Sequence, residues 1–397
     1  MSAILIREFE KELANTLSYW ATYAVDKVNG GFFGQIDNDN KVVEKADKGA
    51  VLNSRILWFF SAAYNYNKLP ESLDLAKRSY DYIRAHFVDK QFGGIYWSVD
   101  FQGRPSDTKK QIYALAFAIY GITEFYKATK LEEALTLAKK LYADIEKYSF
   151  DPINEGYFEA FSRQWSELTD FRLSDKDANE KKTMNTHLHV LEAYSNLYAV
   201  WPDEKLARQI RRLLDVFIHK IIDKHTHHLR LFFDENWHSK SRIISFGHDI
   251  EASWLLLEAA EALGDESLIR QFKAMAVEMA ISAGQGLDEN GGLNYEFEQP
   301  YWNREKHWWV QAEAMVGFFN AFQLTKEPAY SSKFVKCWEF TKTYLIDMQK
   351  GEWFWGVNED LSLMPEQYKA GLWKCPYHNG RACLEMIRRL SISPNIF

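Results

Sequence analysis

The sequence is poor in the residues that interrupt regular structure. Glycine accounts for 20 and proline for 9 of its 397 residues, against a usual roughly 7% and 5%. A β-sandwich with frequent turns, or a doubly wound sheet with glycine-rich loops, uses more of both. Their scarcity therefore favours a mostly helical chain.

Three further absences narrow the class of protein. The formal net charge of −7 provides no basic field for nucleic acid or anionic lipid. No uncharged segment approaches the ~20 residues of a membrane span, and the first twenty residues form a charged amphipathic helix rather than a signal peptide. The three cysteines, with no CxxC spacing, suit a reducing compartment. We therefore expect a cytoplasmic protein that binds neither nucleic acid nor membrane.

Aromatic residues, in contrast, are abundant, with 14 Trp, 21 Tyr and 27 Phe making up 16% of the chain. Their faces are platforms on which sugar rings stack, and they also fill large hydrophobic cores. Composition alone leaves both interpretations open.

Six copies of one unit organise the chain. Short aromatic, strand-like runs recur along it, most of them opened by glycine. They are GGFFG from Gly30, GGIYW from Gly93, EGYFEAF from Glu155, HLRLFF from His228, GGLNYEF from Gly291 and GEWFWGV from Gly351. The steps between their starts are 63, 62, 73, 63 and 60 residues, a spacing too regular for chance.

Two kinds of helix are predicted to alternate with these runs. Amphipathic stretches rich in Lys and Glu predict solvent-facing helices at 6–26, 71–89, 131–148, 204–223, 266–283 and 329–347. Stretches that are apolar nearly all round predict buried helices at 54–66, 111–126, 186–198, 246–263, 306–324 and 378–390.

This alternation predicts an all-α protein, an (α/α)6 barrel of six inner and six outer helices. The inner helices would all begin at one mouth, and the aromatic segments would surround it. No Pro-, Gly- or Ser-rich linker divides the chain, so we expect one domain over residues 1–397. An α-solenoid is the structural alternative, but its repeats of about 33–47 residues are shorter.

The residues that open the buried helices form a candidate site. They are Arg55, Tyr113, His189, His248, Glu251, Trp308, Trp309 and His378. Any one histidine alone would be interpreted as an ordinary core or surface residue. Three histidines at equivalent places in three repeats, with an arginine and a glutamate at matching places in others, point to catalysis.

His248 and Glu251 are three residues apart and so share one helix face. A carboxylate there is predicted to hold one imidazole nitrogen and to raise the basicity of the other, as a general base requires.

The remaining histidines do not suggest a metal site. His187 and His189 are two apart and point to opposite helix faces, so at most one faces the axis. His225, His227 and His228 lie in a connection and are expected at the surface. No third ligand stands at a familiar zinc spacing, and dinucleotide, P-loop and GxSxG motifs are missing. We expect no metal and no cofactor, which leaves acid/base chemistry beside a sugar carbonyl.

At these residues the sequence resembles the N-acylglucosamine 2-epimerase superfamily, and within it most closely the cellobiose 2-epimerases. The matching segments include NSRILWFFSAAY, KTMNTHLHVLEAYSNLY, SFGHDIEASWLL, HWWVQAEAMVGF and WKCPYHNGRACLEMIRR, and they run in order from about residue 31 to residue 389. The resemblance implies an (α/α)6 barrel that inverts C2 of a reducing-end aldose without cofactor or metal.

The resemblance also implies roles for individual residues. His248 and His378 would be the acid/base pair, and Glu251 would tune His248. Arg55 and His189 would bind the carbonyl-derived oxygen. The polar contacts to the sugar would be Tyr113, Asp177 and Asn185. The aromatic walls would be Trp308, Trp309 and Trp373.

These residue types fit the chemistry of epimerisation. A pyranose must open before its C2 hydrogen becomes acidic, and the enediolate that then forms needs preorganised donors. Histidines, with an ordinary pKa of about 6.5, act as acid or base near neutral pH.

Other functions on the same barrel remain open. A D-mannose/D-glucose 2-epimerase or an aldose-ketose isomerase, acting on a monosaccharide, would share the enediolate. An inverting glycoside hydrolase would need two carboxylates about 6.5–9.5 Å apart; Glu251 and Asp177 qualify, but three histidines would then have no task. A glycan-binding barrel without activity would leave His248 beside Glu251 unexplained.

The segment 299–306 departs from what we expect of disaccharide epimerases, because Tyr301 and Trp302 add bulk to it. We expect this loop at the mouth, where each ring would be either a stacking platform for an outer sugar or a lid over a monosaccharide. The resemblance favours the disaccharide, with cellobiose converted to glucosylmannose and lactose to epilactose.

Overall fold

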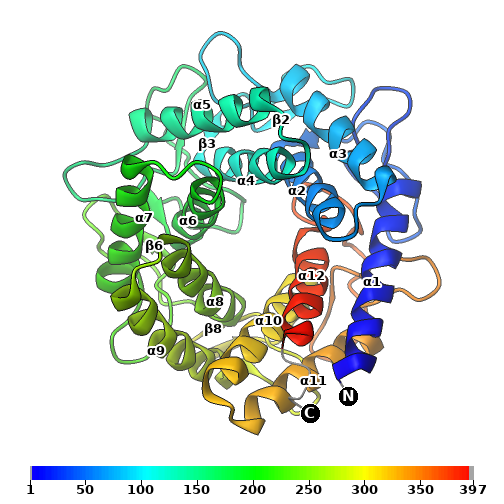
Figure 1. Cartoon of the computed structure of the whole chain (residues 1–397), viewed down its shortest axis with the longest axis vertical. Coiled ribbons are helices and arrows are strands. Elements are labelled where there is room, and N and C mark those ends of the chain that lie inside the picture. Colours follow the sequence, from blue (N-terminus) through cyan, green and yellow to red (C-terminus); the bar gives the residue numbers. More distant parts are fainter. Residues whose placement is uncertain (1, 393–397) are drawn as a thin grey trace.

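Two concentric rings of helices surround a central axis in the computed structural model, which describes residues 2–392 (Figure 1). The outer ring consists of α1 (Ser2–Tyr23), α3 (Pro70–Tyr82), α5 (Glu132–Tyr148), α7 (Glu204–Val216), α9 (Glu266–Ala283) and α11 (Pro328–Tyr344). The inner ring consists of α2 (Ala50–Asn67), α4 (Ile112–Thr129), α6 (Met184–Tyr198), α8 (Phe246–Leu263), α10 (Trp308–Thr325) and α12 (Tyr377–Ser391). The predicted (α/α)6 barrel is confirmed.

Hydrophobic patterning decides which ring a helix joins. In α7 the buried residues Leu206, Ile210 and Leu213 recur at helical spacing while charged residues face solvent, so this helix lies outside. In α2 every residue from Val51 to Phe60 is buried. Each inner helix contacts the next, and α12 closes the ring on α2.

Helix bounds agree with the sequence prediction to within four residues once the π-helical turns after α3 and α7 are counted with those helices, and α8 and α9 agree at both ends. Short π-helical turns extend two outer helices, η1 (Ile83–Phe87) after α3 and η2 (Phe217–Ile221) after α7. A 3-10 turn, η3 (Gly284–Gly286), follows α9.

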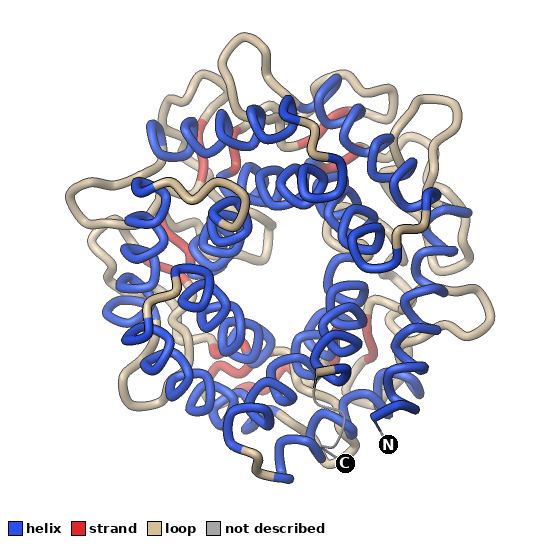
Figure 2. The backbone as a smooth tube through the Cα atoms, in the orientation of Figure 1, coloured by secondary structure: helices blue, strands red, loops and turns tan. Residues whose placement is uncertain are grey.

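The two sides of the barrel have different connections. Inner helices pass to the next outer helix through short turns such as Lys68 and Leu69, whereas outer helices reach inner ones through long segments that carry the strands, spread around the ring (Figure 2). Antiparallel two-residue strands pair β1 (Lys48–Gly49) with β2 (Ser98–Val99), β3 (Lys110–Gln111) with β4 (Ala160–Phe161), β5 (Lys182–Thr183) with β6 (Phe232–Phe233) and β10 (Lys306–His307) with β11 (Gly356–Val357). A three-stranded sheet contains β7 (Ile244–Ser245), β8 (Glu296–Glu298) and β9 (Tyr301–Asn303).

The aromatic runs are strand-like in part: each begins with an isolated bridge, and four of the six end in a strand, namely β4, β6, β8 and β11. Each contributes a single bridge to the residues that follow the preceding outer helix, for example Phe32 with Val25 and Ile95 with Val88. Glycines with positive φ, such as Gly30 at 82° and Gly93 at 79°, turn the chain tightly there. The strands instead join each long connection to the next one, which ties neighbouring repeats together.

Buried lysines fix where most inner helices begin. Lys48, Lys110 and Lys182 each stand just before an inner helix and pair with an aspartate after the preceding outer helix, at 2.8, 2.9 and 2.7 Å. Lys306 and Lys374 take the same place in later repeats. In the fourth repeat Ile244 occupies it.

The first and last helices of the chain meet, so the ring closes between α1 and α12 (Figure 1). Indole donors reinforce this closure: Trp353 Nε1 donates to Glu12 at 2.7 Å, and Trp20 Nε1 donates to Glu352 at 2.6 Å. Within residues 2–392, no helix is both long and apolar enough to cross a bilayer.

Candidate active site

A cavity of about 510 Å³ lies where the inner helices begin, and its volume is typical of small-molecule sites. All the residues singled out from the sequence line it: Arg55, Tyr113, Asp177, Asn185, His189, His248, Glu251, Trp308, Trp309, Trp373 and His378. Side chains separated by more than 300 residues thus come together in one place.

One layer of the site repeats the sixfold register of the barrel. Equivalent positions before the six inner helices are occupied by Lys48, Lys110, Lys182, Ile244, Lys306 and Lys374. The residues seven positions after them are, in the same order, Arg55, Phe117, His189, Glu251, Glu313 and Arg381. The latter are all buried. Sequence reasoning missed Phe117, Glu313 and Arg381, although counting from the repeated lysine would have found them.

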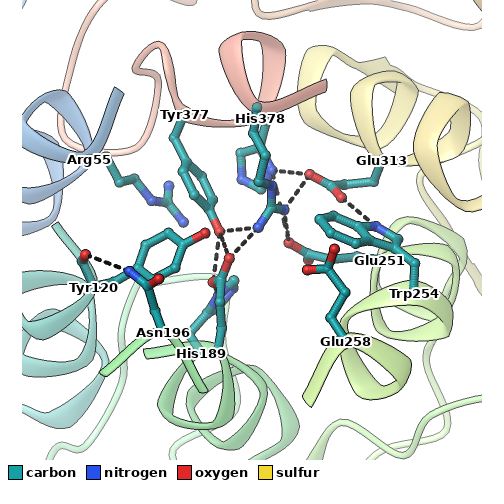
Figure 3. Close-up of polar contacts among 12 residues, drawn as sticks. Arg55, Tyr120, His189, Asn196, Glu251, Trp254, Glu258, Glu313, Tyr377 and His378 are labelled. Atoms are coloured by element: carbon teal, nitrogen blue, oxygen red, sulfur yellow. Dashed lines mark hydrogen bonds and ion pairs between the residues drawn. The ribbon is translucent and has the colours of Figure 1, made fainter. Parts of the chain in front are cut away.

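His378, in the first turn of α12, is held by a carboxylate from α10. Its Nδ1 donates to Glu313 Oε1 at 2.7 Å, and Glu251 Oε1 lies 4.0 Å from the same nitrogen (Figure 3). Burial, with Arg55 and Arg381 acting in the same direction, holds the pKa of His378 well below its ordinary value. The imidazole is therefore neutral and can accept a proton at Nε2.

His189 has a carboxylate partner of its own. Its Nδ1 donates to Glu192 Oε2 at 2.9 Å, one helical turn away. Burial raises the pKa of Glu192, but Arg381 and the His189 hydrogen bond outweigh that effect and lower it to about 2. The neighbouring His187 faces the other way, where Nε2 accepts from the Tyr157 amide at 2.8 Å, so its role is structural.

His248 does not have the partner predicted for it. Its Nδ1 hydrogen-bonds with Ser245 Oγ at 2.8 Å, whereas Glu251 accepts from Arg381 NH2 at 2.9 Å. The predicted Glu251–His248 hydrogen bond is wrong, because His248 in the first turn of α8 reaches back to β7 while Glu251, one turn on, points to the axis. Burial lowers the pKa of His248 to about 3, so this imidazole is neutral too.

Arg381 donates to carboxylates from three inner helices: Glu192 on α6, Glu251 on α8 and Glu313 on α10. One guanidinium nitrogen donates to Glu192, and the other to Glu251 at 2.9 Å and Glu313 at 2.6 Å. Burial, and then Glu313, raises the pKa of Glu251 to about 8.

Glu251, Glu313 and His378 offer ligand atoms within 4.8 Å of one another, a spacing that suits a metal ion. Arg381 already donates to both of these carboxylates. The arrangement is therefore that of a buried salt-bridge cluster, and we assign no metal to it.

Arg55 presents a fixed cation to the cavity. Its guanidinium lies 4.1 Å from the Phe117 ring centroid and 4.7 Å from that of Tyr377, and NH2 donates to the Tyr113 hydroxyl at 2.8 Å. Held between aromatic faces, this group is suited to bind a negative oxygen without reorganisation.

Aromatic rings and polar groups form the outer part of the cavity. Trp309 lies between two histidines, its ring 4.8 Å from His248 and 5.7 Å from His378. Asp177, in the segment before β5, accepts from the Ser174 amide at 2.9 Å. Sequence reasoning did not single out six further lining residues, although the first two and Trp355 lie in aromatic runs predicted to surround the mouth: Tyr295, Glu296, Asn303, His307, Trp355 and Tyr368.

Neither role expected for Tyr301 and Trp302 is met, because neither ring lines the cavity. Trp302 stacks on Phe246 at 5.6 Å and packs against Phe297, and Tyr301 is 77% exposed. Because strand side chains alternate, Trp302 points to the face of the β8–β9 hairpin opposite to Asn303, which lines the cavity, while Tyr301 lies at the exposed end of the hairpin.

His228 is also not where the sequence suggested. It is buried, and its Nδ1 donates to Asp249 Oδ2 at 2.6 Å. It lies against the first turn of α8 rather than at the surface, whereas His225 is exposed as expected.

The chain matches known sugar epimerases along nearly its whole length. The family model for N-acylglucosamine 2-epimerase (GlcNAc 2-epimerase) matches residues 31–382. The chain is 50% identical to a cellobiose 2-epimerase of Bacteroides fragilis, over 98% of this chain and 100% of that protein. It is 41% identical to a cellobiose 2-epimerase of Ruminococcus albus, over 97% of this chain and 99% of that protein. The solved structure of a cellobiose 2-epimerase from Bacillus thermoamylovorans superposes with a TM-score of 0.94 at 42% identity, over 98% of this chain and 100% of that one.

A chain matched over this length, with an (α/α)6 barrel and histidines grouped at one mouth, belongs to the N-acylglucosamine 2-epimerase family. It is a carbohydrate 2-epimerase, an isomerase whose substrate is a small sugar.

Proposed function

We propose that this epimerase inverts C2 of the reducing-end glucose of a β-1,4-linked disaccharide, converting cellobiose to glucosylmannose and lactose to epilactose. The relatives with 50% and 41% identity, both cellobiose 2-epimerases, support this substrate class. The observation that carries the mechanism is that three histidines line one cavity with each Nδ1 engaged. Their Nε2 atoms are then left for the sugar.

Ring opening is the first step. It takes an acid for the ring oxygen and a base for the anomeric hydroxyl, and only the open aldehyde acidifies the C2 hydrogen. The neutral His189 accepts the hydroxyl proton at Nε2, and Glu192 on Nδ1 stabilises the resulting imidazolium.

The enediolate forms when a neutral histidine removes the C2 proton. Its negative oxygen lies near the Arg55 guanidinium and the N–H that His189 has gained. Fixed donors in a buried site are worth more than the same donors in water, and this is the largest stabilising effect in such reactions.

Inversion requires the proton to return on the other face of C2. His248 and His378 come from different inner helices, α8 and α12, and both contact Trp309 in the cavity, which supports two bases that approach C2 from two directions. The first histidine is neutral and takes the C2 proton, which it later releases to water. The second returns to C2 a proton that it has taken up from water during the reaction. The two histidines exchange these roles in the two directions of the reaction.

The outer part of the cavity supports a disaccharide. Tyr301 and Trp302 do not line the cavity, so the choice between a disaccharide and a monosaccharide does not depend on these two rings. Beyond the histidines, Asp177, Glu296 and Trp373 provide the mixture of carboxylates and rings that binds a second sugar.

Proton NMR in D2O with EDTA tests the function. Cellobiose should give glucosylmannose carrying deuterium at C2, because an imidazole base exchanges its proton with water. Product free of deuterium would contradict the mechanism, release of glucose would indicate a hydrolase, and a kcat/KM for mannose tenfold or more above that for cellobiose would overturn the disaccharide.

We further propose that the chain works in the cytoplasm as one catalytic domain over residues 1–397. Cys337, Cys375 and Cys383 are free and buried, which suits a reducing compartment. Every inner helix from α2 to α12 contributes to the layer of residues around the axis, so no smaller part of the chain holds the site.

A further inference from the structure

Two of the three cavity histidines depend on carboxylates that bind the same arginine. Glu192 holds His189 and Glu313 holds His378, and Arg381 donates to both glutamates from opposite ends of its guanidinium. The two histidine–carboxylate pairs come from α6 and from α10 with α12, and Arg381 of α12 connects them.

The third histidine stands outside this network. His248 hydrogen-bonds with the neutral hydroxyl of Ser245, and Ser245 has no contact with Arg381 among residues 2–392. The two proposed bases, His248 and His378, are therefore held by groups of different charge.

We propose that Arg381 is a positioning residue that couples His189 to His378 by binding both of their carboxylate partners with one guanidinium. The inference rests on the proposed function, since it assigns Arg381 an influence on residues placed in the reaction there. Arg381 itself does not line the cavity and acts through Glu192 and Glu313.

The physical effect follows from competition for the carboxylates. A carboxylate that neutralises an arginine stabilises a neighbouring imidazolium less than a free one does. Arg381 therefore keeps His189 and His378 neutral and ready to accept protons, while its planar fork holds both glutamates in place.

Other charged and titratable groups act on the same histidines. Those facing His378 or His189 from the surrounding helices are Arg55 on α2, Tyr113 on α4, Glu192 on α6, Glu251 on α8, Glu313 on α10, and Tyr377 and Arg381 on α12. Among these, Arg381 donates to both carboxylates that hold a histidine.

Titration of the free enzyme tests the coupling. Histidine labelled with ¹³C at Cε1 gives one NMR signal per ring, and His→Asn variants assign the signals. In Arg381→Met the midpoints of both His189 and His378 should rise by about 1 pH unit or more, because a cation is lost nearby, while the midpoint of His248 should move less. A variant in which neither His189 nor His378 moves would overturn the proposal.

A second pair of variants measures the coupling itself. Glu192→Gln should lower the midpoint of His378, since Arg381 is then left to Glu313 and Glu251. In the Arg381→Met background this effect should shrink, and such non-additivity identifies the coupling. An equal effect in both backgrounds would show that Glu192 acts on His378 without Arg381, and this result would refute the proposed coupling.

Arg389 provides a matched control on the same helix. It is buried, lies eight residues beyond Arg381, and donates to Glu385 and Asn320 at 2.9 Å, away from the cavity. Arg389→Met should leave the midpoints of His189 and His378 unchanged. An equal shift in this control would show a general loss of packing and would contradict the proposal.

Arg381→Lys keeps the experiment decisive if the methionine variant fails to fold. Lysine retains the charge but cannot bind two carboxylates with a planar fork, so the effect of Glu192→Gln on His378 should shrink in this background also. An undiminished effect would overturn the proposal. Because no sugar is present, the titration stands even if the deuterium experiment refutes the proposed epimerisation.

Discussion

Burial sets the protonation of the residues around the axis. It lowers the pKa of His248 to about 3 and raises that of Glu251 to about 8, so both groups favour their neutral forms at neutral pH. A site that holds Arg55 and Arg381 as permanent cations thereby avoids an excess of negative charge from its glutamates.

Removing either proposed base should abolish most of the activity. His248→Ala and His378→Ala should each lower kcat for cellobiose by about a hundredfold or more, the usual size of a general acid/base contribution. His225→Ala, on the exposed connection before β6, is the control and should be unaffected. If both variants are folded by circular dichroism and keep near-normal kcat, the assignment is wrong.

Glu251 should make stability depend on pH. Its folded pKa of about 8 lies above the ordinary value of 4.5, so its contribution is complete below pH 4.5 and is lost as pH rises toward 8. Glu251→Gln does not lose this contribution. The difference in apparent Tm, variant minus wild type, should therefore increase between pH 5 and 8, and a constant difference would contradict the assigned shift. Its kcat should fall less than that of the histidine variants, since it keeps both bases.

At the scale of elements, the long connections carry the specificity that the helices do not. The β8–β9 hairpin extends the β7 strand that precedes α8, and its two faces differ. Glu296 and Asn303 line the cavity, whereas Trp302 packs against Phe246 and Phe297.

Opposite faces of this hairpin should respond differently to mutation. Tyr301→Ala should leave kcat/KM for cellobiose within about twofold, because the ring does not line the cavity. Trp302→Ala should lower the apparent Tm, since it removes an aromatic stack worth about 0.5–1.5 kcal/mol. Asn303→Ala should raise KM for cellobiose more than KM for mannose. A tenfold change in either direction for Tyr301→Ala would show that the ring does meet the sugar.

At the scale of the whole molecule, the barrel depends on closing its ring between α1 and α12. Glu352 is central to this closure: it accepts from Trp20 Nε1 at 2.6 Å, from Lys374 Nζ at 2.7 Å and from Asn379 at 2.7 Å. Lys374 is fully buried, and Glu352 is its ion-pair partner.

Neutralising Glu352 should therefore destabilise the whole barrel. Glu352→Gln leaves the ammonium of Lys374 buried without an opposite charge, a loss of about 3–5 kcal/mol. Differential scanning fluorimetry should show a fall in apparent Tm of several degrees. Glu359→Gln, an exposed position in the same repeat, should show none, and an equal fall there would remove the structural explanation.

The sequence by itself determined the repeat, the two kinds of helix and the part of the cavity that the first turns of the inner helices line. A helix with no polar face must be buried, and a repeat fixes which end of each buried helix meets the others, so Arg55, His189 and His378 could be grouped without coordinates.

Only the tertiary structure decided which polar groups pair. Glu251 shares a helix face with His248 yet bonds Arg381, 130 residues away, and Glu313 reaches His378 from another helix. Trp302 likewise turned outward to fill a gap beside Phe246. Local patterning sets how far a side chain is buried, but the partner depends on how neighbouring helices are rotated and how far along the axis each one lies, and that is fixed by packing around the closed ring.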